Sequence, residues 1–397
     1  MKILFCGDSP TANTGFGIVS KNIVGRLVER GHNLVVLGIN HYGDPYDPEE
    51  FPYPIYPCDK GPQVEAIFGM YKLWTLVKEF KPDVLFFLND PWIIEKYIQL
   101  KNIETPYLKT IAYFPIDGGP LKKQWANTLS KLDVQVCYSE FGERVITEAN
   151  GGKKPKNLRQ IYHGVDRKIF RPVVQQVARQ KLGIPLDAFV VGMVARNQYR
   201  KRFDILVSAF AEFAKDKPNA KLYLHTVLKD IGFDIPDLID QFDLADKLIL
   251  TEDMPNPAKG VPAEFLNLIY NSFDINVLVS TGDGFGLPVA ESMATGCPQL
   301  VSDHSCLKEL VDGHGGLTVK NAAWLLNTTG INTWGAISDV QDLTDKLNLL
   351  YSSRDLRIKL SEDGYAYITQ PKFDWEVIVD QFEAVINETM HILPRSK

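Results

Sequence analysis

The sequence lacks the features that mark several classes of protein. Its five cysteines are scattered over 397 residues without a CxxC pair, which argues against a disulfide scaffold or a zinc module and favours a reduced, cytoplasmic protein. The N-terminus reaches a turn after a few apolar residues and has no signal-peptide core. No apolar run approaches the ~20 residues that span a bilayer. The chain has neither a tandem repeat nor a low-complexity tract.

An excess of positive charge is also missing. Lys and Arg total 43 against 49 Asp and Glu, a net charge of −6, which argues against a surface built to hold nucleic acid. A local basic cleft remains compatible with this balance. Hydrophobic residues make up 45% of the chain, an ordinary globular value, and the length favours two domains.

Strand-length apolar runs alternate with longer helical patterns along the chain. This alternation predicts parallel sheets covered by helices on both faces. The rhythm breaks over residues 162–183 and then resumes, so we predict two doubly wound α/β domains joined near residue 170. The predicted strands are 2–6, 33–38, 83–88, 109–114, 134–138, 189–194, 221–225, 247–250, 275–279 and 298–302, and the predicted helices include 20–30, 71–80, 143–149 and 203–213. We expect a long surface loop at 41–61 and assign no structure to 321–337.

Ligands of open parallel sheets bind at the carboxyl ends of the strands, so the residues after each predicted strand are candidates. The first strand is followed by Gly15, Phe16 and Gly17, where a glycine-rich turn into a helix would suit an anion. The spacing is not that of a GxGxxG dinucleotide motif. A flexible connection without a ligand is an equal alternative for this segment.

The strongest local signal follows the predicted strand 275–279. It reads Asp283-Gly284-Phe285-Gly286-Leu287-Pro288-Val289-Ala290-Glu291. Backbone amides at such a turn suit a diphosphate or a sugar hydroxyl, and a carboxylate in the following helix can accept hydrogen bonds from ribose. The structural alternative is a tight turn with Glu291 as an ordinary helix carboxylate.

Four cations follow the predicted strand 189–194. We expect Arg196 and Lys201 to face a phosphate-rich ligand, and Arg200 and Arg202 to face solvent. A solvated charge run is the alternative interpretation. We also expect the side chains of Lys201 and Glu291 to lie near the surface of a cleft, where truncation would leave packing largely unchanged.

These motifs resemble those of retaining glycosyltransferases with the GT-B fold, of the family 4 group (glycosyl transferases group 1). Asp283…Glu291 resembles the E-x7-E stretch, with Asp in place of the first Glu. Val191-Gly-Met-Val-Ala-Arg196 with Lys201 is similar to the phosphate clamp. The other matching segments are Ser292…Pro298, Tyr162-His-Gly-Val-Asp166 with Phe170-Arg-Pro172, Glu309…Gly316 and Phe373-Asp-Trp-Glu376, and together the matches span nearly the whole chain in the family's order.

The resemblance implies two Rossmann-like domains facing each other across a cleft. The first would be residues 1–170, with the helix 372–397 packing back on it, and would bind the acceptor. The second, 171–371, would bind a UDP- or GDP-linked sugar as co-substrate, without a further cofactor. By resemblance, Glu291 would hold the ribose, and Arg196 and Lys201 the diphosphate. Asp283 with the segment Gly284, Phe285, Gly286 and Leu287 would face the sugar and diphosphate, and Gly15, Phe16 and Gly17 would close on it from the first domain.

One departure from the family pattern concerns the first domain. Residues Tyr113 to Pro120 lack the histidine that relatives often place beside the donor sugar, so Asp117 is the candidate for a catalytic contact there, with a turn residue as the alternative. The sequence shows no DxD motif flanked by a strand, and the two cations would hold the leaving diphosphate, so we expect no metal.

The resemblance leaves several alternatives open. The acceptor would be a hydroxyl of a glycan, a lipid or a small molecule, and contact with a membrane surface is compatible with the pattern. Rival functions are glycosylation of modified DNA bases, epimerisation of a nucleotide sugar, and binding of a nucleotide sugar without catalysis. The sugar, the base and the oligomeric state are not readable from the sequence.

Overall fold

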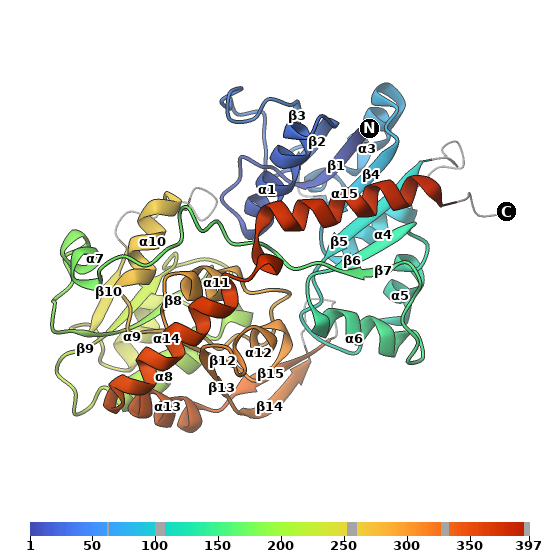
Figure 1. The fold of residues 1–397 in the computed structure, drawn as a ribbon. Coiled ribbons are helices and arrows are strands. Elements are labelled where there is room, and N and C mark those ends of the chain that lie inside the picture. The colour runs from blue at the N-terminus through green and yellow to red at the C-terminus, as the bar shows by residue number, and fades with distance from the viewer. Residues whose placement is uncertain (62, 100–107, 252–259, 327–332, 393–397) are drawn as a thin grey trace. The chain divides into compact units, whose positions relative to one another are not determined.

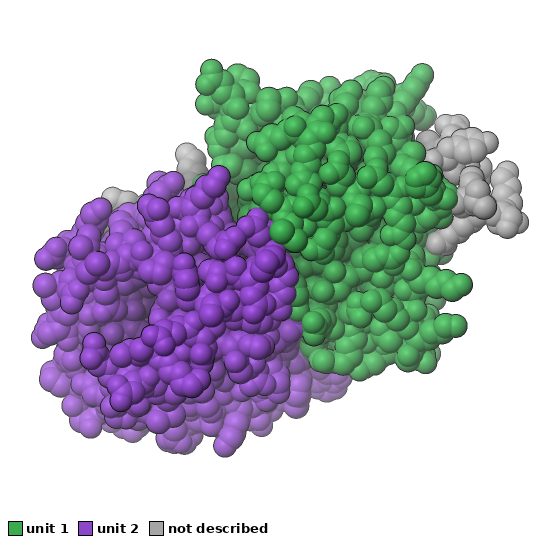
Figure 2. All heavy atoms as spheres, in the orientation of Figure 1, with its two compact units in different colours: residues 1–164, 375–397 green, residues 165–374 purple. Residues whose placement is uncertain are grey.

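The computed structural model describes the chain except residues 62, 100–107, 252–259, 327–332 and 393–397. It separates into two compact units, coloured in Figure 2. Unit 1 comprises Met1–Gly164 and Trp375–Lys397, and unit 2 comprises Val165–Asp374. The sequence predicts these boundaries at 170 and 371. Each unit is an α/β domain of the doubly wound type (Figure 1).

In the described part of unit 1, seven parallel strands form one sheet in the order β3-β2-β1-β4-β5-β6-β7. The strands are β1 (Lys2–Asp8), β2 (Asn33–Ile39), β3 (Ile55–Pro57), β4 (Val84–Leu88), β5 (Lys109–Phe114), β6 (Val134–Cys137) and β7 (Leu158–Gln160). The helices are α1 (Gly15–Glu29), α2 (Val64–Ile67), α3 (Met70–Phe80), α4 (Pro91–Gln99), α5 (Lys123–Leu129), α6 (Glu140–Ala149) and α15 (Trp375–His391). The central strand β4 reads VLFFL with every residue buried, as expected for a sheet covered on both faces.

Helix α1 begins five residues before the predicted start at residue 20. Thr14 has extended backbone and its Oγ1 accepts a hydrogen bond from the amide of Gly17, so it caps the helix at this point. Gly17 is required here, because a Cβ atom would lie 2.0 Å from the carbonyl oxygen of Ala12. The cap therefore fixes the turn between β1 and α1.

The C-terminal helix α15 packs within unit 1, against α1 and β5. The ring of Phe382 lies 5.5 Å from Phe86 and 4.8 Å from Tyr113, measured between ring centroids. Arg30 on the chain after α1 forms ion pairs with Glu376, Asp380 and Glu383. A segment from the end of the chain thus completes the cover of the first sheet.

In the described part of unit 2, six parallel strands follow the order β10-β9-β8-β11-β12-β13. They are β8 (Phe189–Val194), β9 (Ala220–His225), β10 (Leu248–Leu250), β11 (Ile275–Leu278), β12 (Gln299–Ser302) and β13 (Gly316–Val319). The helices are α7 (Gln175–Leu182), η1 (Tyr199–Lys201), α8 (Phe203–Phe213), α9 (Ile235–Gln241), α10 (Ala263–Ser272), α11 (Leu287–Ala294), α12 (Ser305–Val311), α13 (Val340–Ser352), α14 (Arg354–Ile368) and η2 (Pro371–Phe373). The strand order reverses between β8 and β11, which is where such sheets open a crevice for ligands.

The two segments predicted to be irregular, 41–61 and 321–337, differ from each other in structure. In the loop 41–61, Phe51 and Tyr53 are buried and β3 adds to the edge of the first sheet, so this loop also contributes to the core. The segment 321–337 carries an antiparallel hairpin of β14 (Asn321–Leu326) and β15 (Trp334–Ser338), with residues 327–332 outside the described part. Of the helices that the structure describes, none has both the length and the apolar character needed to cross a bilayer.

Candidate functional site

A buried ion pair lies at the carboxyl edge of the sheet in unit 2. Lys201 belongs to η1, in the connection after β8, and Asp283 lies in the connection after the neighbouring strand β11. The Lys201 Nζ is 2.7 Å from Oδ1 and 2.9 Å from Oδ2 of Asp283. The structure therefore brings together two of the residues predicted from separate motifs, at the point where the strand order reverses.

The carboxylate of Asp283 accepts two further hydrogen bonds, and its backbone amide donates one. Arg200 Nη1 donates to Oδ1 at 2.5 Å, Ser280 Oγ donates to Oδ2 at 2.6 Å, and the Asp283 amide donates to Ser305 Oγ at 3.1 Å. Burial alone would raise the pKa of Asp283, but the charges of Lys201 and Arg200 and the hydrogen bonds from Lys201 and Ser280 outweigh it. They hold the pKa of Asp283 well below its usual range, so the group is ionised.

Arg196 is held by a different carboxylate. Its Nε lies 2.7 Å from Oδ2 of Asp230 and its Nη2 lies 3.3 Å from Oδ1. The side chain of Arg196 is 52% exposed. The buried Asn197 holds the loop that carries Asp230. Its side-chain amide donates to the carbonyls of Val227, Leu228 and Phe233, and its Oδ1 accepts from the amide of Phe233. The two predicted clamp cations therefore pair with separate carboxylates.

The glycine turn leads directly into α11. Gly286 caps this helix with a φ of +95°, and a Cβ atom at this position would lie 2.6 Å from Leu307 Cδ2. Glycine is thus required twice, by backbone conformation and by the contact. The first helical bonds of α11 run from Val289 and Ala290 to the carbonyl of Gly286, so the amides of the preceding turn are not used by the helix itself. This turn contains the predicted segment Gly284, Phe285, Gly286 and Leu287.

Glu291 lies in α11 with its carboxylate buried against α10. Tyr270 donates its hydroxyl hydrogen to Oε2 of Glu291 at 2.9 Å. Burial raises the pKa of Glu291 to about 8, although the bond from Tyr270 opposes the shift. The carboxyl group is consequently close to its titration point at neutral pH, and a polar ligand that donates hydrogen bonds to it would favour the ionised form.

Three expectations about side-chain exposure are wrong. Lys201 and Glu291 are 6% and 5% exposed rather than near a cleft surface, because Asp283 and Tyr270 draw them beneath the loops at the sheet edge. Arg200 does not simply face solvent, since it donates to Asp283 and to the carbonyl of Gly282. Arg202 pairs with Asp204 and its side chain is 24% exposed. Substitutions at these sites will therefore also affect stability.

The corresponding edge of unit 1 is built around the buried Asp8 at the end of β1. Its Oδ2 accepts hydrogen bonds from Thr14 Oγ1 at 2.5 Å and from Asn40 Nδ2 at 3.1 Å. Burial raises the pKa of Asp8, against the effect of these two bonds. Because the Gly17 amide is already bonded to Thr14, the amides of Gly15 and Phe16 remain the predicted contacts of this turn.

The other first-domain candidate, Asp117, follows β5 at the same edge and is half-buried. His163, which stands where the family motif has Asn, is buried, and its Nδ1 lies 2.7 Å from the hydroxyl of Tyr113 on β5. Burial lowers the pKa of His163 to about 3, so its ring is neutral. Gly15, Phe16, Gly17 and Asp117 all belong to unit 1, whereas Arg196, Lys201, Asp283 and Glu291 belong to unit 2.

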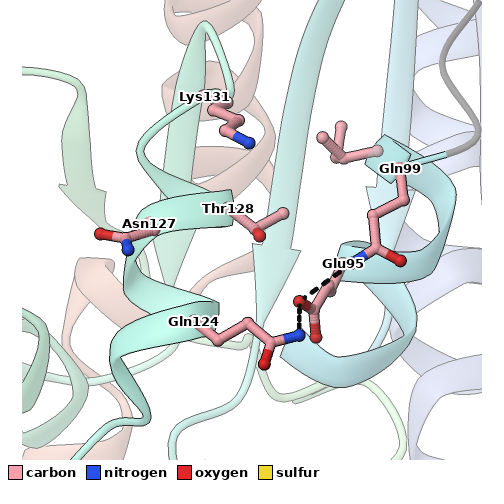
Figure 3. A pocket seen from close by; sticks show the side chains of 7 residues that line it. Glu95, Gln99, Gln124, Asn127, Thr128 and Lys131 are labelled. Carbon is pink, nitrogen blue, oxygen red and sulfur yellow. Dashed lines mark hydrogen bonds between the residues drawn. The ribbon is translucent and has the colours of Figure 1, made fainter.

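A polar cavity of about 450 Å³ lies elsewhere on unit 1, between α4 and α5 (Figure 3). It is lined by Glu95, Ile98, Gln99, Gln124, Asn127, Thr128 and Lys131. Oε1 of Glu95 accepts hydrogen bonds from Gln99 and Gln124. Lys131 lies three residues before the start of β6, so the cavity extends toward the amino ends of the strands. It is therefore separate from the candidate site at their carboxyl ends.

Sequence reasoning missed several residues that build the site. Ser280 and Ser305 follow β11 and β12, so their position after predicted strands is the signal that could have found them. Asn197 carries the same signal, because it follows β8, whereas only the fold brings Asp230 and the loop 227–233 beside the end of that strand. In the sequence, Tyr270 occupies an ordinary position on the apolar face of a helix, which gives no signal of a role in the site.

The comparisons with known proteins agree with this geometry. Residues 174–367 match the family model described as Glycosyl transferases group 1. A D-inositol 3-phosphate glycosyltransferase of Corynebacterium urealyticum is 29% identical over 382 residues, which cover 91% of this chain and 82% of the relative. The corresponding protein of Acidothermus cellulolyticus is 32% identical over 217 residues, 51% of this chain, and the alignment spans 46% of its length.

The crystal structure of the Anabaena protein HepE, in complex with UDP and glucose, has the same fold. Its TM-score to this chain is 0.74 at 17% sequence identity, and the superposition covers 98% of this chain and 100% of that one. HepE shares the two Rossmann-like α/β domains of the GT-B fold. The second unit thus matches the model of the glycosyl transferases of group 1 over residues 174–367, and the whole chain has the GT-B architecture.

Proposed function

We propose that this protein transfers a sugar from a nucleoside diphosphate to a hydroxyl acceptor, with retention of configuration at the anomeric carbon and without a metal ion. The observation that carries the proposal is the cluster of Lys201, Arg200 and Asp283 at the crevice between β8 and β11. Two cations around one carboxylate leave a net positive charge at the position where ligands of such sheets bind.

The diphosphate is the part of the donor that this cluster suits. As the bond to the sugar breaks, negative charge develops on the leaving phosphate, and fixed positive charge at that point stabilises the transition state. The N-terminus of α11 adds a positive dipole end beside the same loop. Arg196 is exposed and can move from Asp230 to a phosphate group. Asp283 acts in this scheme by holding Lys201 and Arg200 in place.

Glu291 is the proposed ribose contact. Acidic side chains accept hydrogen bonds from ribose hydroxyls in dinucleotide-binding folds, and Glu291 would do the same from the helix that follows the glycine turn. Tyr270 fixes one carboxylate oxygen and thereby orients the other. The structure of HepE with UDP and glucose supports a uridine diphosphate as the first donor to be tested. The names of the glycosyltransferase relatives support a hydroxyl acceptor.

The same charges support the proposed metal independence, and the proposed retention rests on the leaving phosphate. Lys201, Arg200 and Arg196 supply positive charge that a metal ion supplies in other transferases. The departing phosphate, once formed, can accept the proton of the incoming hydroxyl on the same face of the sugar. No nucleophilic side chain is assigned in this proposal.

The test begins with thermal-shift binding of UDP, GDP and ADP and their common sugars, with EDTA present. A ligand bound by the native state raises the melting temperature by mass action, so we expect one diphosphate to stabilise the protein. Nucleotide release is then measured with a panel of sugar and polyol acceptors, and the anomeric configuration of the product is read by NMR. Binding of no diphosphate would overturn the proposal. Formation of an epimeric nucleotide sugar without nucleotide release would instead assign an epimerase, and an inverted product would remove retention.

A further inference from the structure

The β14–β15 hairpin is an addition to unit 2 that the proposed chemistry does not use. Its two strands pair only with each other and form a small antiparallel sheet beside the parallel sheet. The pairing places Leu326 opposite Trp334 and Trp324 opposite Ala336. Directly opposed residues share a face, and so do residues two apart along one strand. Trp324, Leu326 and Trp334 therefore lie on the same face, and we call these three residues the indole patch.

The hairpin is fixed to the loops that carry the candidate site. The amide of Ala336 donates to the carbonyl of Thr281 at 2.9 Å, and Thr281 in turn donates its amide to the carbonyl of Arg200. Gly335 approaches so closely that a Cβ atom would lie 2.8 Å from Cβ of Thr281. At the other end, Asn321 Nδ2 donates to the carbonyl of Asp303, after β12. The hairpin thus has a defined position beside the edge that carries Asp283.

The indole patch is exposed although its residues are large and apolar. Trp324, Leu326 and Trp334 are 52%, 42% and 46% exposed. The edge of Trp324 contacts the ring of His304, with centroids 5.0 Å apart, which fixes one indole in place. Single exposed apolar side chains are ordinary, but a contiguous group on one face indicates a contact surface. Two indoles held on a hairpin offer flat apolar area together with N–H donors at little cost in conformational entropy.

The lack of charged residues in the hairpin limits the kind of partner that would bind it. Residues 321–338 read NAAWLLNTTGINTWGAIS and contain no Lys, Arg, Asp or Glu. Contact with anionic lipid would favour Lys or Arg beside the aromatic residues, and a charged peptide would favour opposite charge. A pyranose ring instead presents a face of C–H groups that packs on an indole, while its hydroxyls accept the indole N–H bond. The patch therefore matches a neutral saccharide.

We propose that the indole patch binds a neutral saccharide chain, with Trp324 and Trp334 stacking on sugar rings, and that this chain carries the acceptor hydroxyl. The assignment of the chain as acceptor rests on the proposed function, whereas the binding surface itself does not. The hydrogen bonds of Thr281 with both Ala336 and Arg200 hold the hairpin at the loops that would hold the donor, with Gly335, on the face opposite the patch, packed on Thr281.

The experiment measures binding of maltotetraose, cellotetraose, mannotetraose and chitotetraose by calorimetry and by tryptophan fluorescence. The variants are Trp324→Ala and Trp334→Ala, with Trp324→Phe to retain a flat ring. Tyr71→Ala is the matched control, because Tyr71 is 59% exposed on α3 of unit 1. We expect at least one saccharide to bind the wild type, with about tenfold or greater loss of affinity in each Trp→Ala variant and a smaller loss in Trp324→Phe. The control and the affinity for the nucleoside diphosphate should not change.

Other outcomes separate this inference from the proposed function. If no saccharide binds, or if binding is equal in both Trp→Ala variants and the wild type, the patch is not a saccharide surface. Binding to vesicles of phosphatidylcholine with phosphatidylglycerol that is lost in the variants would overturn the saccharide assignment in favour of a lipid. If saccharide binding depends on the indoles but no diphosphate binds, the surface stands and the proposed transferase function fails.

Discussion

At the residue scale, the candidate site depends on how buried charges are compensated. Asp283 is ionised because Lys201 and Arg200 surround it, whereas Glu291 has a tyrosine hydroxyl as its partner and burial raises its pKa to about 8. The two acidic ends of one motif therefore differ in charge state near neutral pH. This difference suits their proposed roles, with Asp283 holding cations and Glu291 meeting a ligand that donates hydrogen bonds.

The ion pair gives a prediction that separates stability from chemistry. Lys201→Met leaves Asp283 buried with Arg200 as its one remaining cation, so unfolding should become easier by about 3 kcal/mol. The double variant Lys201→Met/Asp283→Asn should recover much of this stability but not sugar transfer. Urea denaturation and nucleotide release measure the two effects. Lys359→Met, in the exposed pair with Asp363, is the control and should cost less than about 1 kcal/mol. Recovery of transfer in the double variant would contradict the role of Lys201.

Glu291 gives a prediction on pH. The folded state binds a proton to Glu291 up to about pH 8, whereas the unfolded chain releases it near the ordinary value of 4.5. Stability therefore falls as pH rises through this window, and Glu291→Gln removes the effect. From pH 5 to pH 9, the free energy of unfolding of Glu291→Gln should increase relative to that of the wild type by about 1–3 kcal/mol, since one pKa unit is about 1.4 kcal/mol. Denaturation curves at several pH values test this, with the exposed Glu362→Gln as control. Parallel pH profiles for wild type and Glu291→Gln would contradict it.

At the element scale, the turns into the first helices decide the geometry of both sheet edges. In unit 1 the turn is held by the chain of hydrogen bonds from Gly17 through Thr14 to Asp8. In unit 2 the turn into α11 depends on the left-handed conformation of Gly286. Both turns contain glycines that the contacts with neighbouring atoms require, which means that part of the glycine pattern reflects packing and part can serve a ligand.

Helix α1 contains a matched pair of glycines that tests this account. Gly17→Ala should destabilise the protein by about 2 kcal/mol or more, because the Cβ atom would overlap the carbonyl of Ala12. Gly25→Ala, where nothing lies within 4 Å of the added atom, should stabilise it by about 0.5–1 kcal/mol through helix propensity. Chemical denaturation of the two variants measures both signs. Equal effects would show that the turn adapts without strain.

At the scale of the whole molecule, each unit completes its own core, and unit 1 does so with two distant parts of the chain. Phe382 of α15 packs against Phe86 and Tyr113 of the first sheet, and Arg30 joins α1 to α15 through three carboxylates. The second unit is continuous in sequence and carries the residues proposed to bind the donor. Damage to the core of unit 1 should therefore leave nucleotide binding by unit 2 in place.

Phe382→Ala tests this division. Loss of the buried ring should reduce the stability of unit 1 by about 3–5 kcal/mol. Below the melting temperature, the affinity for the nucleoside diphosphate should stay within about twofold of the wild type. Calorimetric unfolding and nucleotide titration provide the two measurements, and Met390→Ala, at an exposed position of the same helix, is the control. A loss of nucleotide affinity that parallels the loss of stability would show that the units do not act separately.

The sequence by itself determined the α/β class, two doubly wound units and the resemblance to the glycosyl transferases of group 1. Hydrophobic periodicity and short motifs are local properties, and they record which residues form strands and which turns follow them. They also located Lys201, Asp283 and Glu291. The sequence could not show that Asp283 is the counter-ion of Lys201, because 82 positions separate them and only the pairing of β8 with β11 brings their loops together.

The tertiary structure alone decided the environments of these residues. It placed Arg196 against Asp230, buried Glu291 against Tyr270 and formed the β14–β15 hairpin from a segment without a clear period. It also identified glycines, such as Gly17 and Gly286, that close contacts require. The physical reason is that burial, charge compensation and close backbone contact depend on neighbours in space, which local patterns do not encode.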